Sequence, residues 1–155
     1  MDFGDDVTRV ETHLSSSGKE VFVMHARQRT VAVIGASADR SKFGNKAVRA
    51  FRDQGWLVFP IHPHRAEIEG VRAYPRLRDV PTPHLDRVSF YVPPEVGLSV
   101  IDDLAGMSVG EIWLNPGSES TELLQRLSQL GLATIQACSI LALGRDPGEY
   151  SDQPE

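Results

Sequence analysis

A run of apolar residues that ends on a glycine constrains this chain more than any other feature. Val31–Ile34 has the composition of a buried strand, Gly35–Ser37 is small and polar, and apolar residues recur at helical spacing from Phe43 onward. This order predicts a strand, a tight turn and a helix, with Gly55 as the helix stop. The first free N–H groups of such a helix face the turn, so the turn is a ready site for a phosphate group.

Strand and helix patterns then alternate along the chain. We expect further strands at 56–61, 87–92, 111–114 and 132–137, helices at 94–105 and 120–130, and short turns near 77–80 and 140–143. Such alternation implies right-handed crossovers and a sheet covered on both faces. The predicted fold is α/β, a Rossmann-like three-layer sandwich with a mainly parallel five-stranded sheet.

The sequence divides into three parts. Residues 1–27 have weak hydrophobic periodicity, so they are expected to form a loosely packed N-terminal extension. Within it we expect a short helix near Val7–Leu14. Residues 28–143 are expected to form the Rossmann-like domain. Residues 144–155 are polar and acidic, and we expect a flexible tail that frays.

Composition indicates a soluble protein of the cytoplasm. The chain of 155 residues fits one domain, has no apolar run long enough to cross a membrane, and lacks the basic and apolar start of a signal peptide. Its single cysteine, Cys138, excludes an internal disulfide and fits a reducing compartment.

Positive charge is concentrated around the opening motif. The net charge is −5, yet residues 35–65 carry six basic and two acidic side chains. Because nucleic-acid binding usually requires a broadly basic domain, this island suits a small anionic ligand better. We therefore predict no nucleic-acid partner and no membrane partner.

The turn after the first strand is not a known nucleotide fingerprint. Gly35 is followed by no second or third glycine at G-x-G-x-x-G spacing, and the next glycine is Gly44. The second strand ends on His62-Pro-His-Arg65, without the acid that NAD sites usually place there. A basic strand end suits an extra phosphate on the ribose, as in NADP or coenzyme A. There is no P-loop either, because no G-K-[ST] follows a four-residue spacer.

Several segments, in order over roughly residues 28–143, resemble the coenzyme A-binding domain family. They are Val31–Ser37, Gly55–Pro63, Glu69–Pro75 with Leu77 and Val80-Pro81, Tyr91–Glu95, Ile112–Leu114, and Gly131-Leu132 followed by Cys138. The fold of this family is shared with the N-terminal domain of the succinyl-CoA synthetase alpha subunit. The chain departs from single-domain relatives at Val92-Pro93, where they commonly carry Arg-Pro, and at Asn115–Ser118.

The resemblance implies a ligand site built from the ends of the strands. The turn after the first strand would hold the pyrophosphate, the end of the second strand would hold the adenosine and its 3′-phosphate, and the next two strand ends would line the pantetheine path. The implied cofactor-binding residues are Gly35, Ala36, Ser37, Arg40, Lys42, Phe43, Ile61, His62, Pro63, Arg65, Tyr91, Val92, Pro93, Asn115 and Gly117.

Competing interpretations of individual residues are less specific. Ser37 does not stand in G-x-S-x-G, so it suits phosphate bonding better than nucleophilic catalysis. Asp39 or Ser41 is expected to cap the following helix. His62 and His64 have no further ligand nearby, so no metal site is predicted. Cys138 resembles a buried small hydrophobe, although its position at the ligand edge leaves a redox or thioester role open.

We therefore expect a protein that binds coenzyme A or acyl-CoA and performs no catalysis by itself. The related ligases pass a phosphoryl group through a histidine on a separate domain, so a ligase partner subunit is one expected partner and a homodimer is another. An NADP-binding oxidoreductase-like domain and a ligand-free regulatory interaction module remain as alternatives.

Overall fold

The computed structural model describes residues 7–14 and 20–154 and is organised around a five-stranded sheet. Its strands are β3 (Thr30–Ile34), β4 (Leu57–Ile61), β7 (His84–Phe90), β8 (Ser108–Leu114) and β9 (Ala133–Gln136). Their order is β4-β3-β7-β8-β9, and every neighbouring pair is parallel. This confirms the predicted α/β Rossmann-like sandwich.

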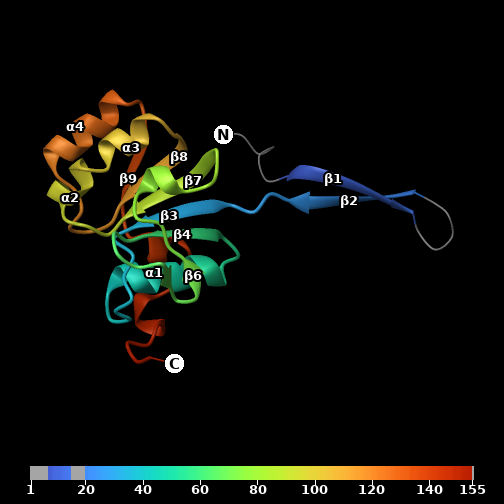
Figure 1. Ribbon diagram of the computed structural model, residues 1–155, viewed down its shortest axis with the longest axis horizontal. Coiled ribbons are helices and arrows are strands. Elements are labelled where there is room, and N and C mark those ends of the chain that lie inside the picture. The colour runs from blue at the N-terminus through green and yellow to red at the C-terminus, as the bar shows by residue number, and fades with distance from the viewer. Residues whose placement is uncertain (1–6, 15–19, 155) are drawn as a thin grey trace.

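Helices cover both faces of the sheet, as Figure 1 shows. One face carries α1 (Phe43–Asp53) and the short α5 (Ser139–Ala142). The other carries α2 (Pro94–Leu98), α3 (Ile101–Ala105) and α4 (Thr121–Gln129). Successive residues of a strand point to opposite faces. Accordingly, Val31 and Val33 are buried with the α1 side chains, whereas Ala32 and Ile34 are buried with those of α3 and α4.

The structure corrects several predicted boundaries. The single helix expected at 94–105 is broken into α2 and α3 around Ser99 and Val100. The third strand begins at His84 and the fourth at Ser108, each three residues before the expected position. The loop after β4 also contains a small hairpin, β5 (Glu67–Ile68) with β6 (Val71–Arg72), and the 3-10 turn η2 (Leu77–Asp79).

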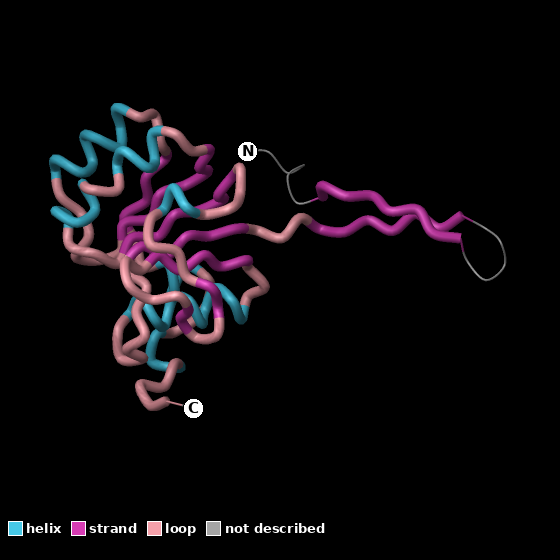
Figure 2. The backbone as a smooth tube through the Cα atoms, in the orientation of Figure 1, coloured by secondary structure: helices cyan, strands magenta, loops and turns pink. Residues whose placement is uncertain are grey.

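The helix expected near Val7–Leu14 was wrong. This segment is strand β1 (Val7–Leu14), which pairs antiparallel with β2 (Glu20–Ala26). The valines and threonines of 7–12 are β-branched, and such residues favour strands over helices. The hairpin extends away from the sheet in Figures 1 and 2.

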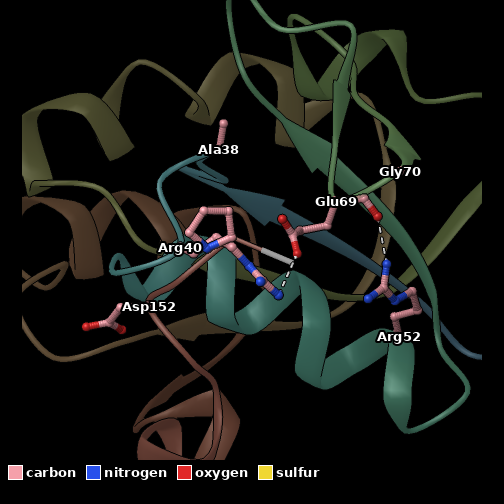
Figure 3. Close-up of a pocket in the computed structure, with 7 residues that line it drawn as sticks. Ala38, Arg40, Arg52, Glu69, Gly70 and Asp152 are labelled. Atoms are coloured by element: carbon pink, nitrogen blue, oxygen red, sulfur yellow. Dashed lines mark hydrogen bonds and ion pairs between the residues drawn. The ribbon is translucent and has the colours of Figure 1, made fainter.

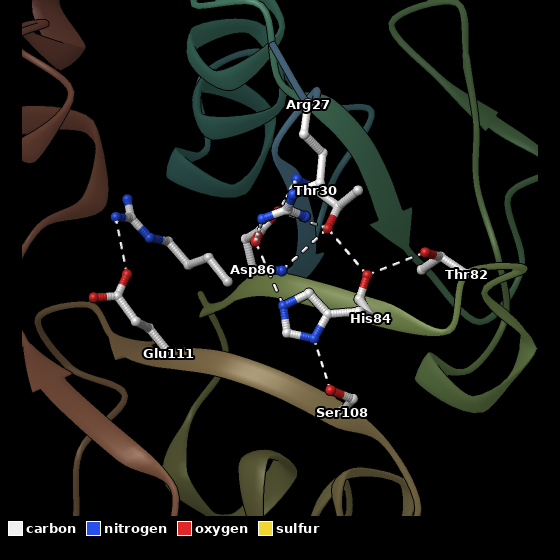
Figure 4. Close-up of polar contacts among 8 residues, drawn as sticks. Arg27, Thr30, Thr82, His84, Asp86, Ser108 and Glu111 are labelled. Atoms are coloured by element: carbon white, nitrogen blue, oxygen red, sulfur yellow. Dashed lines mark hydrogen bonds and ion pairs between the residues drawn. The ribbon is translucent and has the colours of Figure 1, made fainter. Parts of the chain in front are cut away.

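An ion pair connects the segment between this hairpin and β3 to strand β7. Both guanidinium Nη atoms of Arg27 donate to the carboxylate of Asp86, at 3.0 and 2.5 Å. The same carboxylate accepts from the backbone N–H of Thr30 at 2.8 Å, and His84 Nε2 lies 3.4 Å from it (Figure 4). Although burial opposes ionisation, the hydrogen bonds from Arg27 and Thr30 hold the pKa of Asp86 below its usual range.

The described part of the tail, residues 144–154, lies against α1. It contains the 3-10 turn η3 (Pro147–Glu149), after which Tyr150 is 8% exposed and packs in the α1 side of the core. Lys46 Nζ of α1 lies 2.8 Å from Asp152, and Arg40 donates to the carbonyl oxygen of Gln153. The tail therefore has defined contacts where the sequence led us to expect fraying.

In the part of the chain that the structure describes, none of the helices is long and apolar enough to cross a bilayer.

Candidate functional site

A groove runs along the edge of the sheet where the parallel strands end. It consists of two adjoining cavities, which we call the first cavity, of about 480 Å³, and the second cavity, of about 350 Å³. Both are lined by Gly35, Lys42, Tyr91 and Val92. Small-molecule sites usually have volumes of about 300–1,000 Å³. In open parallel sheets, ligands bind at this edge where the strand order reverses, here between β3 and β7.

Most of the predicted site residues lie in this groove. The first cavity is lined by Gly35, Ala36, Ser37, Lys42, Ile61, His62, Pro63, Tyr91 and Val92. The second cavity adds Phe43, Pro93 and Gly117. Asn115 lines a smaller adjoining cavity of about 110 Å³, the third cavity, together with Phe43 and Tyr91.

Two glycines let α1 cross the end of β3 at close range. A Cβ placed on Gly44 would lie 2.1 Å from the carbonyl oxygen of Gly35, and one placed on Gly35 would lie 2.7 Å from that of Tyr91. Gly35 also has a φ of 85°, a conformation that side chains disfavour. Gly44 thus performs the close helix–strand packing that the third glycine provides in G-x-G-x-x-G, at a longer spacing. Its position in the sequence alone did not indicate this role for Gly44.

The N-terminus of α1 faces the groove, and no acidic side chain neutralises its partial positive charge. Its N-cap is Lys42, which makes no side-chain capping bond, and its first turn contains no acidic residue. The cap expected from Asp39 or Ser41 is therefore wrong: the Asp39 carboxylate instead accepts from the backbone N–H and hydroxyl of Ser41. A helix N-terminus without a carboxylate keeps its partial positive charge for an anion.

Buried polar side chains of α1 hold the turn after β3 from behind. Asn45 is fully buried and donates through Nδ2 to the carbonyl oxygen of Ser37 at 2.9 Å. Arg49 in turn donates to Asn45 Oδ1 at 2.9 Å and to the carbonyl oxygen of Arg40 at 3.1 Å. These bonds fix the backbone of the turn, so a phosphate would meet an ordered loop.

His62 stands at the β4 end of the groove as a neutral side chain. Partial burial lowers its pKa, and the nearby His64 and Arg65 lower it further. Its Nδ1 accepts backbone N–H bonds from His64 and Arg65, each at 3.0 Å, so the ring proton belongs on Nε2. His62 can therefore donate one hydrogen bond to a ligand in the first cavity. Arg65 is exposed and does not line this cavity.

One wall of the first cavity consists of residues that the sequence did not indicate as site residues. It contains Pro75, Arg76, Leu77, Val96, Ser99, Val100 and Asp103. Asp103 is 6% exposed and accepts from Arg76 Nη2 at 2.9 Å and from Arg78 Nε at 2.8 Å. The aspartate thereby fixes Arg76 at the groove, where its guanidinium adds donors. No periodic pattern connects Arg76 with Asp103, because one lies in a proline-rich loop and the other in α3.

At the other end of the groove, most polar atoms are already paired inside the protein. Asn115 donates through Nδ2 to Ser89 Oγ and the Phe90 carbonyl oxygen, both at 2.8 Å, and its Oδ1 accepts from the backbone N–H of Ser139 at 2.8 Å. Asn115 therefore shapes the wall of the third cavity and is not an open donor. The Tyr91 hydroxyl is buried there and has no hydrogen-bond partner.

The order of the strands determines which residues follow one another along this edge of the sheet. From β4 to β9 the strand ends carry His62, Gly35, Tyr91, Asn115 and Cys138 in turn. Neighbouring strands are about 4.8 Å apart, so the five ends span about 19 Å. Arg76 and His62 line the first cavity, at the β4 end, and the third cavity, toward the β9 end, has a mostly apolar lining. This geometry fits an elongated ligand with phosphates at one end.

Arg40 lies outside the groove. It lines a separate cavity of about 530 Å³ between the turn, α1, the β5–β6 hairpin and the tail. There Arg40 Nη2 is 3.2 Å from Glu69 Oε1, and Arg52 donates to the Glu69 carbonyl oxygen at 2.7 Å (Figure 3). The carboxylates of Glu69 and Asp152 line this cavity too, so its positive charge is already compensated. The groove is therefore the more favourable site for an anionic ligand.

Comparison with known proteins identifies the family of the region that forms this groove. Residues 29–145 match the CoA binding domain family. The chain belongs to this family. The matched region begins just before β3 and contains every strand end that lines the groove. A cradle at Gly35 that admits no side chain, facing a helix N-terminus, fits a phosphate group.

The relatives include both small proteins and ligases. The alpha subunit of an ADP-forming acetate–CoA ligase II from Pyrococcus furiosus is 37% identical over 54 residues, covering 34% of this chain and 12% of that subunit. The structure of a conserved hypothetical protein from Pyrococcus furiosus aligns with a TM-score of 0.67 and 32% identity, covering 74% of this chain and 98% of that one.

A larger enzyme contains the same fold as one part. The dinucleotide-forming acetyl-coenzyme A synthetase 1 of Candidatus Korarchaeum cryptofilum aligns with a TM-score of 0.61 and 31% identity. The alignment covers 70% of this chain but 25% of the synthetase. The chain therefore spans nearly all of the small archaeal protein and a minor part of both ligases.

Proposed function

We propose that this protein binds coenzyme A or acyl-CoA in the groove at the sheet edge. The observation that carries the proposal is the order along the groove, which runs from His62 and the cation Arg76 through the Gly35 cradle to the walls around Tyr91. A ligand with phosphates at one end and an uncharged arm at the other matches this order. Membership of the CoA-binding domain family supports the same ligand.

In the proposed complex the pyrophosphate occupies the turn after β3. The N–H groups at Gly35–Ser37 and the start of α1 would bind it, with Lys42 supplying charge at the junction of the two cavities. The adenosine and 3′-phosphate would occupy the first cavity beside Ile61–Pro63 and Arg76. The pantetheine arm would follow the second cavity past Pro93 and Gly117.

We also propose that the bound ligand is held without turnover by this chain alone, in the cytoplasm. The carboxylate that lines the groove, Asp103, is committed to Arg76 and Arg78, and the groove's histidine, His62, uses Nδ1 to accept backbone bonds. The two ligase relatives support a partner subunit as an alternative to a second copy of the chain. Turnover is tested by incubating the protein with acetyl-CoA and measuring the free thiol of coenzyme A that is released. We expect no release above the rate without protein.

Calorimetric titration tests the binding proposal. We expect saturable binding of coenzyme A, weaker binding of its 3′-dephospho form, and weaker or no binding of NADP. Equal affinity for the dephospho form would refute the role given to the β4 end of the groove. Tighter binding of NADP would favour the oxidoreductase-like alternative, and no binding of any of the three at millimolar concentrations would favour the interaction module.

A matched pair of variants tests the location. Lys42 lines both cavities, whereas Lys46 lies one turn further along α1 and pairs with Asp152 at 2.8 Å. Lys42→Gln is expected to weaken coenzyme A binding about tenfold, since it removes a charge-assisted bond. Lys46→Gln removes the same charge outside the groove and should leave the affinity unchanged. Equal losses in both variants would contradict a specific phosphate contact at Lys42.

A further inference from the structure

The third cavity places the single cysteine beside the groove. Cys138 follows β9 and is partly exposed. It lines the cavity of about 110 Å³ together with Phe43, Tyr91, Asn115 and Pro116. Three of these residues, Phe43, Tyr91 and Pro116, also line the second cavity, so the cysteine lies at the far end of the continuous groove.

An unpartnered donor lies next to this cysteine. The Tyr91 hydroxyl is buried and makes no hydrogen bond. Burial raises the pKa of Tyr91 far above its ordinary value and outweighs the lowering by the nearby Ser89 and Ser139 hydroxyls, so the phenol stays protonated and can donate. The neighbouring hydroxyls of Ser89 and Ser139 are paired with each other at 2.7 Å. Because an unsatisfied buried hydroxyl is costly, the geometry calls for an acceptor from a ligand.

Sulfur chemistry fits both groups. In the orientation proposed above, the pantetheine arm enters the second cavity and its thiol end approaches the third. A partly exposed thiol is accessible to a disulfide, and a neutral O–H donor stabilises the thiolate that leaves during exchange. The cavity therefore combines a thiol that can attack with a donor for the leaving sulfur.

We propose that Cys138 is a modification site that forms a mixed disulfide with coenzyme A. The reaction rests on the proposed function and takes coenzyme A disulfide as its oxidised co-reactant. The Cys138 thiolate attacks one sulfur of this disulfide, a new S–S bond forms and the old S–S bond breaks. One coenzyme A leaves as a thiolate, accepting a hydrogen bond from Tyr91 and then the proton that Cys138 lost. A small thiol reverses the reaction, so the ligand is retained until it is reduced.

Intact-protein mass spectrometry tests the proposal. Wild-type protein is mixed separately with coenzyme A disulfide and glutathione disulfide, and the two rates of adduct formation are compared. The control is the double variant Cys138→Ser with Ser128→Cys, which moves the thiol to an exposed position of α4. The rate ratio of the two disulfides is expected to be about tenfold or more higher in the wild type, because the groove positions the coenzyme A disulfide. Acetyl-CoA, which occupies the groove without a disulfide, should slow the wild-type reaction.

Further variants separate this proposal from the proposed function. Cys138→Ser alone should form no adduct, and Tyr91→Phe should slow the reaction with coenzyme A disulfide several-fold more than the reaction with glutathione disulfide. Equal rate ratios in the wild type and the control would overturn the proposal. If the wild type with reductant binds no coenzyme A in the calorimeter, the proposed function fails. If it binds but shows no preference for coenzyme A disulfide, only the cysteine proposal fails.

Discussion

The close approach of Gly44 to Gly35 makes Gly44→Ala a demanding test of the groove. In an ordinary helix this exchange stabilises by about 1 kcal/mol, because alanine has the higher helix propensity. Here the new Cβ would lie 2.1 Å from the Gly35 carbonyl oxygen. Carbon–oxygen contacts relax to about 3.3 Å or more, so α1 and the turn after β3 must separate by about 1 Å.

This separation affects both stability and binding. Overpacking of this kind costs about 1–3 kcal/mol, which exceeds the propensity gain, so the free energy of unfolding should fall by about 1–2 kcal/mol. The N-terminus of α1 also moves away from the pyrophosphate position, and coenzyme A affinity is expected to fall about tenfold. Urea unfolding and calorimetric titration measure the two effects.

Gly106→Ala is the matched control. Gly106 is the C-cap of α3, has a φ of −98°, and a Cβ added there would meet no atom within 4 Å. We expect its unfolding free energy to stay within about 0.5 kcal/mol of the wild type, with unchanged binding. A Gly44→Ala protein that is as stable as the wild type and binds coenzyme A equally well would refute the reasoning.

Three further predictions concern the supports of the groove and the ends of the domain. Asp103→Asn removes the charge that fixes Arg76, and we expect the free energy of unfolding to fall by about 2 kcal/mol and coenzyme A to bind more weakly. Unchanged binding would show that Arg76 does not depend on Asp103 for its position. Asp86 has a lowered pKa in the folded state, so the stability it contributes is present above its unfolded pKa and is lost as pH falls through the folded value. Asp86→Asn should flatten the acid side of the stability profile in urea unfolding, and a profile that keeps the wild-type slope would contradict the Arg27–Asp86 pairing. Tyr150→Ala should cost about 3 kcal/mol, because Tyr150 is buried against the core; an unchanged unfolding curve would indicate a frayed tail instead.

The sequence was informative wherever the determinants of structure are local. Val31–Ile34 is β-branched and apolar over consecutive positions, and it forms a strand buried on both faces. The helix from Phe43 and the turn at Gly35 follow from spacing and glycine chemistry in the same way. Since parallel strands end at one edge, predicting the strands also predicted that Ile61–Pro63, Tyr91 and Asn115 would gather there.

Non-local contacts were beyond such reasoning. Arg76 and Asp103 meet in one wall of the groove because η2 packs beside α3, and no periodic pattern in the sequence indicates that packing. Arg40 is close to the turn in sequence, but its guanidinium is directed to Glu69 of the β5–β6 hairpin. The expected helix at Val7–Leu14 failed because pairing with β2 outweighs a weak local pattern.

Determining a crystal structure of this protein in complex with coenzyme A would test the central claim most directly. The account predicts pyrophosphate density at Gly35–Ser37 beside the N-terminus of α1, the adenosine and 3′-phosphate beside His62, and the thiol end directed toward Tyr91 and Cys138. Density in the cavity between Arg40 and Arg52, or in the groove with the thiol end at His62, would contradict it.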